Sequence, residues 1–229
     1  MTRKKNPGIP LFSLWPSDEE PKVVKKKRTL ETSYLKIDNS RYVKHKRDAI
    51  RYMIDFINNN YAGMVKTAYD GMAGKGIFTE YLLQIDGLED LRLNDKAEDC
   101  YMYLLQKFHN HPKITRITNT DFFQVVLGVL GRRADLVVVD FNNFTLNRKD
   151  QVDAFLEWIH YNRQWLNLLL YTDSFYFSLK FLKDESERQT KYQEYLKRVE
   201  EALKMKIVAD YPYKNKGCSL ILLQNGEWI

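Results

Sequence analysis

Residues 65–95 constrain the fold of this chain more than any other stretch. A short apolar run at 65–69 leads into a glycine-rich turn at 70–76, and the apolar residues of 77–85 recur near helical spacing. A second apolar run, 91–93, ends at Asn94 and Asp95. This order of strand, glycine turn, helix, strand and acid predicts the front half of a nucleotide-binding α/β unit.

The residue types in this unit suit a nucleoside ligand. Gly74 and Gly76 allow the backbone to approach a ligand closely and tolerate positive φ. A helix that begins after them would direct free N–H groups and its positive dipole end at the site. Asp95 lies 21 positions after Gly74, where a carboxylate could accept both hydroxyls of a ribose. The alternative for Asp95 is a capping box formed with Glu98.

The turn resembles motif I of class I S-adenosylmethionine-dependent methyltransferases, in the Asp-x-x-Ala-Gly-x-Gly form found in some nucleic-acid methyltransferases. The third glycine of dinucleotide dehydrogenases is absent, because Thr79 takes its position, and this disfavours NAD. The resemblance implies that S-adenosylmethionine is the cofactor. The implied cofactor-binding residues are Asp70, Gly71, Met72, Ala73, Gly74 and Gly76 in the turn, Asp95 at the ribose, and Asp121 with Phe122 at the adenine. A helix N-cap is the alternative for Asp121.

The rest of the chain continues the alternation and ends in a hairpin. Further strands are predicted at 114–118, 134–140 and 165–171, and helices at 39–60, 97–109, 121–130, 148–163 and 185–204. Strands 206–213 and 218–224 are separated by only four residues, so they pair antiparallel. Over about residues 45–229 this order matches the resembled fold, a Rossmann-like α/β domain. Its sheet has seven mostly parallel strands, an antiparallel last strand and helices on both faces.

Positive charge is concentrated at the N-terminus. Residues 1–51 hold 14 Lys and Arg against 6 Asp and Glu, a net +8, whereas the other 178 residues hold 22 against 24, a net −2. We predict a basic, proline-containing arm at 1–40 and a methyltransferase-like domain at 41–229. A localised basic arm favours a polyanionic partner, nucleic acid first; a solubilising tail or a targeting signal is the alternative. The expected nucleic-acid-binding residues are Lys25, Lys26, Lys27, Arg28, Lys44 and Arg47.

Other features of the composition point to a cytoplasmic protein. Two cysteines, Cys100 and Cys218, provide neither a disulfide framework nor a metal-ligand spacing, so reduced thiols are expected. No apolar run approaches the ~20 residues of a membrane span, and the N-terminus lacks a signal-peptide core. The arm's apolar cluster at 9–15 could dock on the domain or on a protein partner. No membrane partner and no metal are expected.

Residues 140–144 occupy the position of motif IV in amino-group methyltransferases. By resemblance, Asp140 would accept a hydrogen bond from the target amine and Phe144 would stack on the base. The two prolines of that motif are replaced by Phe141 and Asn142. Asp140 could instead only terminate a strand. On the same rim, the aromatic residues Phe175, Phe177 and Phe181 could stack on bases or pack a helix on the sheet.

Two functions follow from these motifs. The first is a methyltransferase that acts on DNA or RNA, with a base amine as the target. The second is a catalytically inactive protein of the same fold that binds nucleic acid or serves as a subunit of a larger complex. The intact glycine turn favours the enzyme, and the missing prolines favour the inactive protein.

Overall fold

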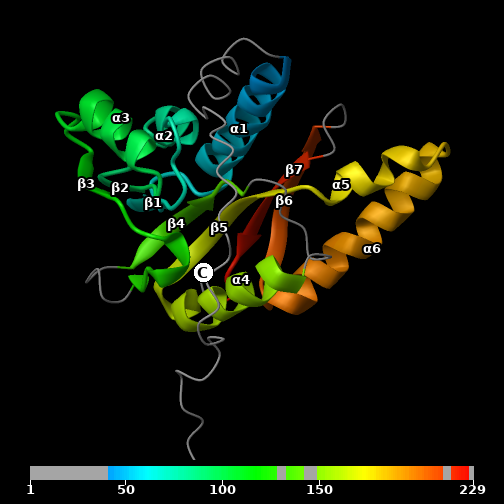
Figure 1. Ribbon diagram of the computed structural model, residues 1–229. Coiled ribbons are helices and arrows are strands. Elements are labelled where there is room, and N and C mark those ends of the chain that lie inside the picture. The colour runs from blue at the N-terminus through cyan, green and yellow to red at the C-terminus, as the bar shows by residue number, and fades with distance from the viewer. Residues whose placement is uncertain (1–40, 128–132, 142–148, 214–217, 227–229) are drawn as a thin grey trace, which may run out of the picture. The chain divides into compact units, whose positions relative to one another are not determined.

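The computed structural model describes residues 41–127, 133–141, 149–213 and 218–226. Seven strands form one sheet in the order β3-β2-β1-β4-β5-β7-β6, with β7 antiparallel to both of its neighbours (Figure 1). The predicted fold class is therefore confirmed. The strands are β1 (Thr67–Asp70), β2 (Asp90–Asn94), β3 (Ile114–Thr118), β4 (Ala134–Val139), β5 (Leu166–Asp173), β6 (Lys206–Tyr213) and β7 (Cys218–Gln224).

Helices cover both faces of the sheet (Figure 1). On one face lie α1 (Arg41–Asn60), α2 (Ile77–Leu82) and α3 (Glu98–Phe108), and on the other α4 (Lys149–Asn162) and α6 (Glu185–Leu203). The short elements are η3 (Phe122–Gln124), η5 (Arg163–Trp165), α5 (Phe175–Ser178) and η6 (Leu179–Phe181). Within the described ranges, no helix is both long enough and apolar enough to span a membrane.

The two central strands supply apolar side chains to both faces. Val137 and Leu169 belong to the core under α4 and α6, whereas Leu136 and Leu168, one residue earlier, belong to the core under α1, α2 and α3. Strands of a parallel sheet that is covered on both sides are typically apolar on both faces. This burial on both faces places β4 and β5 at the centre of the sheet. Because β1, β2 and β4 are parallel, the loops that follow them meet along one edge.

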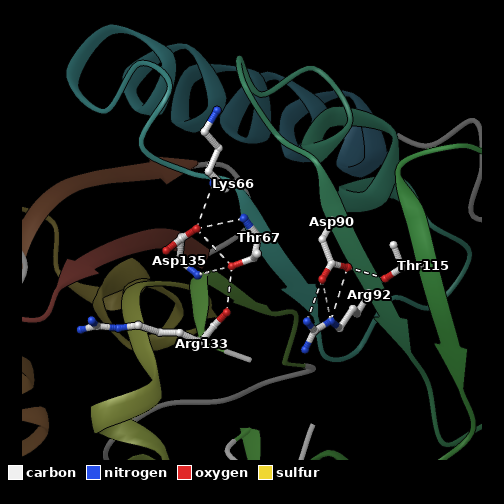
Figure 2. A network of polar contacts seen from close by, with 7 residues as sticks. All are labelled: Lys66, Thr67, Asp90, Arg92, Thr115, Arg133 and Asp135. Atoms are coloured by element: carbon white, nitrogen blue, oxygen red, sulfur yellow. Dashed lines mark hydrogen bonds and ion pairs between the residues drawn. The ribbon is translucent and has the colours of Figure 1, made fainter. Parts of the chain in front are cut away.

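Asp135 links the amino-terminal ends of three strands, and Figure 2 shows its contacts with Lys66 and Thr67 at the start of β1. Its Oδ2 accepts hydrogen bonds from the backbone N–H groups of Lys66 and Thr67, both at 2.9 Å, and from Oγ1 of Thr67 at 3.1 Å. Its Oδ1 accepts from Nδ2 of Asn167 at 3.0 Å. A single carboxylate therefore links the starts of β1, β4 and β5.

The helix predicted at 121–130 is wrong for its described part. Residues 122–124 form one 3-10 turn, and Val125 is extended, with φ −79° and ψ 121°. Two side chains of α4 take the backbone groups that a helix would use: Nε1 of Trp158 donates to the carbonyl of Val125 at 2.8 Å, and Oδ1 of Asn162 accepts from the N–H of Leu127 at 2.6 Å. The other predicted elements are confirmed, with small shifts at their ends.

Candidate active site

The glycine turn after β1 is attached to the strands on both sides. The N–H of Gly71 donates to the carbonyl of Val138 on β4 at 2.9 Å, and the N–H of Ala73 donates to the carbonyl of Asn94 on β2 at 2.9 Å. These bonds fix the turn above the carboxyl end of the sheet. Ala73 is buried in the core under α1, α2 and α3, and Met72 packs against the opposite core.

The side chain of Asn94 connects the turn to the loop after β3. Its Nδ2 donates to the carbonyls of Gly71 at 3.0 Å and Thr120 at 2.9 Å, and its Oδ1 accepts from Oγ1 of Thr118 and from the N–H of Thr120. Asn94 is fully buried. The sequence interpretation treated it only as a strand end. The signal available was an amide next to a strand terminus, where loops need side-chain partners.

Gly74 and Gly76 both adopt the left-handed conformation that the turn requires, with φ of 55° and 75°. Their surroundings differ. A Cβ on Gly76 would lie 2.5 Å from the ring of Phe108, whereas a Cβ on Gly74 would meet no atom within 4 Å. Backbone at Gly74 therefore faces open space, and this is where a ligand could approach the turn closely.

Asp95 accepts hydrogen bonds from the glycine turn and from Ala97, which precedes α3. Its Oδ2 accepts from the N–H of Gly74 at 2.8 Å, and its Oδ1 accepts from the N–H of Ala97 at 2.8 Å. The N-cap of α3 is Ala97, so the alternative of a capping box centred on Asp95 is wrong. Each carboxylate oxygen has a second lone pair, which leaves the half-buried Asp95 able to accept ligand hydroxyls beside Gly74.

Asp70 is fully buried at the end of β1. Oγ1 of Thr79 donates to its Oδ2 at 2.8 Å, and Oδ1 has no hydrogen-bond partner in the described parts of the chain. The pKa of Asp70 is raised to about 7, chiefly by burial; the hydrogen bond from Thr79 and the cation of Lys46 oppose this increase, and the nearby carboxylates of Asp140 and Asp95 contribute to it. Asp70, Asp95 and Asp140 stand at the carboxyl ends of three neighbouring parallel strands, so they lie at one edge of the sheet.

Asp140, directly after β4, is held by two side chains that the sequence interpretation missed. Nζ of Lys46 forms an ion pair with its Oδ2, and Oγ1 of Thr172 donates to its Oδ1 at 2.8 Å. Lys46 belongs to α1 and is buried, with Nζ 5.4 Å from the ring centroid of Phe78. A signal was present, because Lys46 precedes Ile50 by four residues and so lies on the apolar stripe of the helix.

The side chains of Asp121 and Phe122 both make contacts within the protein. Oδ1 of Asp121 accepts from the N–H of Phe123 at 3.1 Å, which makes Asp121 the N-cap of η3, as its alternative predicted. Phe122 is 1% exposed, and its ring centroid lies 4.4 Å from that of Trp158. It also packs over Gly71, where a Cβ would come within 2.5 Å of the phenyl ring. Phe122 is therefore a core residue in this structure.

Several other predicted residues lie elsewhere. Lys44 and Arg47 are exposed on α1, whereas residues 25–28 and Phe144 lie outside the described residues. The ring of Phe175 stacks on Tyr195, with centroids 3.8 Å apart and planes at 9°, and this favours the packing alternative for Phe175. Phe181 is 77% exposed. Among the residues that the structure describes, no group of His, Cys, Asp and Glu could hold a metal ion.

A second buried acid at this edge was also missed. Asp173, the last residue of β5, accepts from Oη of Tyr195 at 2.5 Å and from the N–H of Phe175 at 2.7 Å. Burial raises the pKa of Asp173 to about 7, and the hydrogen bonds from Tyr195 and Phe175 oppose the increase. Its contacts attach α5 and α6 to the end of β5.

Comparison with known proteins identifies the fold. No protein-family model matches the sequence, and neither does any curated protein. Among solved structures, the N-methyltransferase NodS from Bradyrhizobium japonicum, in complex with S-adenosyl-L-homocysteine, aligns with a TM-score of 0.57 at 15% identity, covering 84% of this chain and 91% of that one. An S-adenosylmethionine-dependent methyltransferase from Clostridium acetobutylicum gives 0.56 at 13%, covering 84% and 94%.

A third neighbour, from Pyrococcus horikoshii, is provisionally described as an RNA methyltransferase and gives a TM-score of 0.53 at 11% identity, covering 78% of this chain and 83% of that one. At these identities the likeness establishes the fold. Together with the strand order and the antiparallel β7, it shows that this chain has the class I S-adenosylmethionine-dependent methyltransferase fold.

Proposed function

We propose that this protein is an S-adenosylmethionine-dependent methyltransferase that acts on nucleic acid, at a base amine. The observation that carries the proposal is the meeting of Asp70, Asp95 and Asp140 around the glycine turn, at the ends of β1, β2 and β4. In open α/β sheets, ligands bind outside the carboxyl ends of the strands, where the strand order reverses. In this sheet the reversal lies between β1 and β4.

The residues present fit the cofactor. The backbone of Gly74 is surrounded by open space. Asp95 accepts a hydrogen bond from Gly74 and has further lone pairs that could accept hydrogen bonds from ribose hydroxyls. Asp70 supplies a buried carboxyl with one oxygen that no described residue satisfies. When bound, S-adenosylmethionine would supply an electrophilic methyl group on a sulfonium. The task left to the protein is mainly to hold the acceptor in line with that group.

Asp140 is the residue that we propose contacts the target amine. Lys46 and Thr172 hold both of its oxygens in place, and each carboxylate oxygen has a further lone pair that can accept a hydrogen bond. An amine that donates to Asp140 would be oriented without a proton transfer before methylation. Phe144 is proposed to stack on the base; it lies outside the described residues.

Nucleic acid is proposed as the substrate because of charge. Residues 1–51, which include the arm and the first half of α1, carry the net +8, and Lys44 and Arg47 are exposed on α1. Phosphate contacts of this kind make affinity fall linearly with the logarithm of salt concentration. Deleting residues 2–38 should therefore flatten the salt dependence of DNA or RNA binding and leave cofactor binding nearly intact. An unchanged slope would assign the arm to a protein partner or to the fold.

Calorimetry with S-adenosylmethionine and its demethylated product tests the cofactor without knowledge of the substrate. Wild type should give a binding heat, and Asp95→Ala should weaken binding by about 1–3 kcal/mol, as expected for hydrogen bonds to a charged group. Glu89→Gln, a change at an exposed acid before β2, is the control. No heat and no rise in melting temperature at saturating concentrations of either compound would exclude the enzyme.

One observation favours an inactive protein of this fold as the second candidate. The ion pair with Lys46 already occupies Asp140, and an incoming amine would have to share or displace it. Transfer of a labelled methyl group to mixed DNA and RNA separates the two functions. The enzyme should lose on the order of 10²-fold or more of its rate in Asp140→Ala. Tight nucleic-acid binding without transfer by wild type would indicate the inactive binding protein.

A further inference from the structure

One face of β2 and β3 carries arginines where the neighbouring strands are apolar. In the described part of the chain, the core cluster under α4 and α6 includes residues of β1, β4, β5 and β7 but none of β2 or β3. Arg92 on β2 and Arg116 on β3 are register partners, and Tyr69 on β1 continues the row. Like charges placed directly opposite each other on neighbouring strands are destabilising, so this pair needs a compensating partner.

Only part of the positive charge is compensated by described residues. Nε and Nη2 of Arg92 donate to Oδ2 of Asp90 at 3.1 and 2.7 Å, and Thr115 also donates to Asp90 (Figure 2). This leaves Nη1 of Arg92 and the whole guanidinium of Arg116 without a hydrogen bond or ion pair to any residue in the described ranges. Asp90 therefore offsets part of the charge of Arg92 and forms no hydrogen bond or ion pair with Arg116 in the described ranges.

Both arginines line a cavity of about 230 Å³. Its other described lining residues are neutral: Tyr69, Leu93, Thr118, Thr120 and 124–126. Arg92 is 9% exposed, whereas Arg116 is exposed. The volume is below the roughly 300–1,000 Å³ of sites that enclose a whole small molecule, so the cavity suits one anionic group of a larger ligand.

The cavity adjoins the candidate active site. Thr120 lines it and is bonded to the side chain of Asn94, which also holds Gly71 of the glycine turn. Tyr69 lines it from β1, and the next residue is the buried Asp70. Residues 125 and 126 line the cavity from the segment whose backbone bonds to α4 instead of forming the predicted helix.

We propose that this cavity binds a backbone phosphate of a nucleic-acid strand, with Arg116 and the free edge of Arg92 as its ligands. Guanidinium groups match phosphate oxygens with paired N–H donors, and a phosphate between the two arginines would offset their repulsion. Phosphate contacts fix the register of a strand on a protein. The inference rests on the proposed function, because it identifies one point at which the substrate of that function is held.

The test uses the full-length chain and fluorescence anisotropy with labelled single-stranded RNA and DNA across a range of salt. Arg116→Gln should weaken binding about three- to tenfold at low salt, and the slope of log affinity against log salt should become shallower by about 0.7. Arg116→Lys should recover part of the affinity, since it restores the charge without the paired donors. Arg198→Gln, the same charge change at an exposed position on α6, should match wild type.

The possible outcomes separate this inference from the proposed function. If Arg116→Gln and Arg198→Gln bind both oligonucleotides equally, the phosphate site is wrong, whatever the cofactor result. A second outcome is that inorganic phosphate or a mononucleotide shifts the Arg116 side-chain signal in NMR spectra while Arg116→Gln leaves the affinity for oligonucleotides unchanged. In that case the site binds a small anion and the inference fails. Absence of cofactor binding, with the Arg116 effect intact, would overturn only the proposed methyl transfer.

Discussion

Lys46 of α1 and Asp140 after β4 form an ion pair across 94 residues of sequence. The side chain of Lys46 is 9% exposed and that of Asp140 is 21% exposed, so the pair lies largely out of water. A charge in such a place is tolerated only when it is paired and hydrogen-bonded. The pair therefore fixes α1 against the edge of the sheet that carries the candidate site.

Lys46→Met should lower the free energy of unfolding by about 2–3 kcal/mol. Removing one partner of a fully buried pair costs about 3–5 kcal/mol, because it leaves an uncompensated charge, and the partial exposure of Asp140 reduces this. Urea unfolding at neutral pH provides the measurement.

The matched control is Lys44→Met, at an exposed position of the same helix, which should change stability by no more than about 0.5 kcal/mol. The double variant Lys46→Met/Asp140→Asn should be less destabilised than the sum of its single changes, since it removes both charges. Strict additivity would mean that the two residues do not interact.

Alanine at Gly74 and at Gly76 should separate ligand binding from stability. Both positions have positive φ, which costs a non-glycine residue about 1–2 kcal/mol. Gly76→Ala adds a clash with Phe108 and should be clearly the less stable variant, whereas Gly74→Ala has free space around the new methyl group. Gly74→Ala should therefore melt closer to wild type but lose more affinity for S-adenosyl-L-homocysteine. Calorimetry together with thermal unfolding checks both parts, and the reverse order of affinities would contradict a ligand at Gly74.

The elements that the sequence predicted correctly are those whose signal is local. The glycine turn, the apolar run of β4 and the four-residue link between β6 and β7 each specify their conformation within a few residues. The alternation of strands and helices predicted parallel pairing and the hairpin predicted an antiparallel last strand, whereas the arrangement of the whole sheet was implied by the family resemblance. These signals were sufficient for the fold.

What the sequence could not predict depends on contacts between distant residues. The apolar residues of 122–127 suit a helix. Trp158 and Asn162, more than 30 positions later, instead form hydrogen bonds with backbone groups of this segment. In the same way, the place of Lys46 on the apolar stripe of its helix indicates burial, but nothing near it in the sequence identifies Asp140, 94 residues later, as its partner. Helical periodicity reports which side of a segment is buried and carries no information about which distant partner meets it.

Asp135→Ala should lower the free energy of unfolding by about 2–4 kcal/mol. The change would leave the N–H groups of Lys66 and Thr67 and the amide of Asn167 without their acceptor, and unsatisfied groups cost about 1–3 kcal/mol each when water cannot reach them. Asp135→Asn retains one acceptor oxygen and should cost less. Asp153→Ala, at an exposed position of α4, serves as the control in urea unfolding. Equal stabilities of the Asp135 and Asp153 variants would remove the role assigned to Asp135.

The buried acids Asp70 and Asp173 should make the fold less stable as pH rises towards 8. Burial raises the pKa of each to about 7 from an ordinary value of 3.8. The folded state therefore holds protons that the unfolded state releases. This stabilisation is complete below about pH 4 and is lost as pH rises through 7, with a slope of at most about 1.4 kcal/mol per pH unit for each acid.

Asp173→Asn isolates one of these two contributions. The amide oxygen can still accept from the N–H of Phe175, and the residue stays neutral at every pH. Relative to wild type, the variant should gain stability steadily between about pH 4 and pH 8, because only wild type must bury a charge at the upper end. Urea unfolding at several pH values gives this difference directly, with Asp153→Asn on the surface of α4 as the control that should show no such trend. A stability difference between Asp173→Asn and wild type that stays constant across this range would mean that Asp173 is already ionised at low pH, with Tyr195 and Phe175 fully compensating its burial.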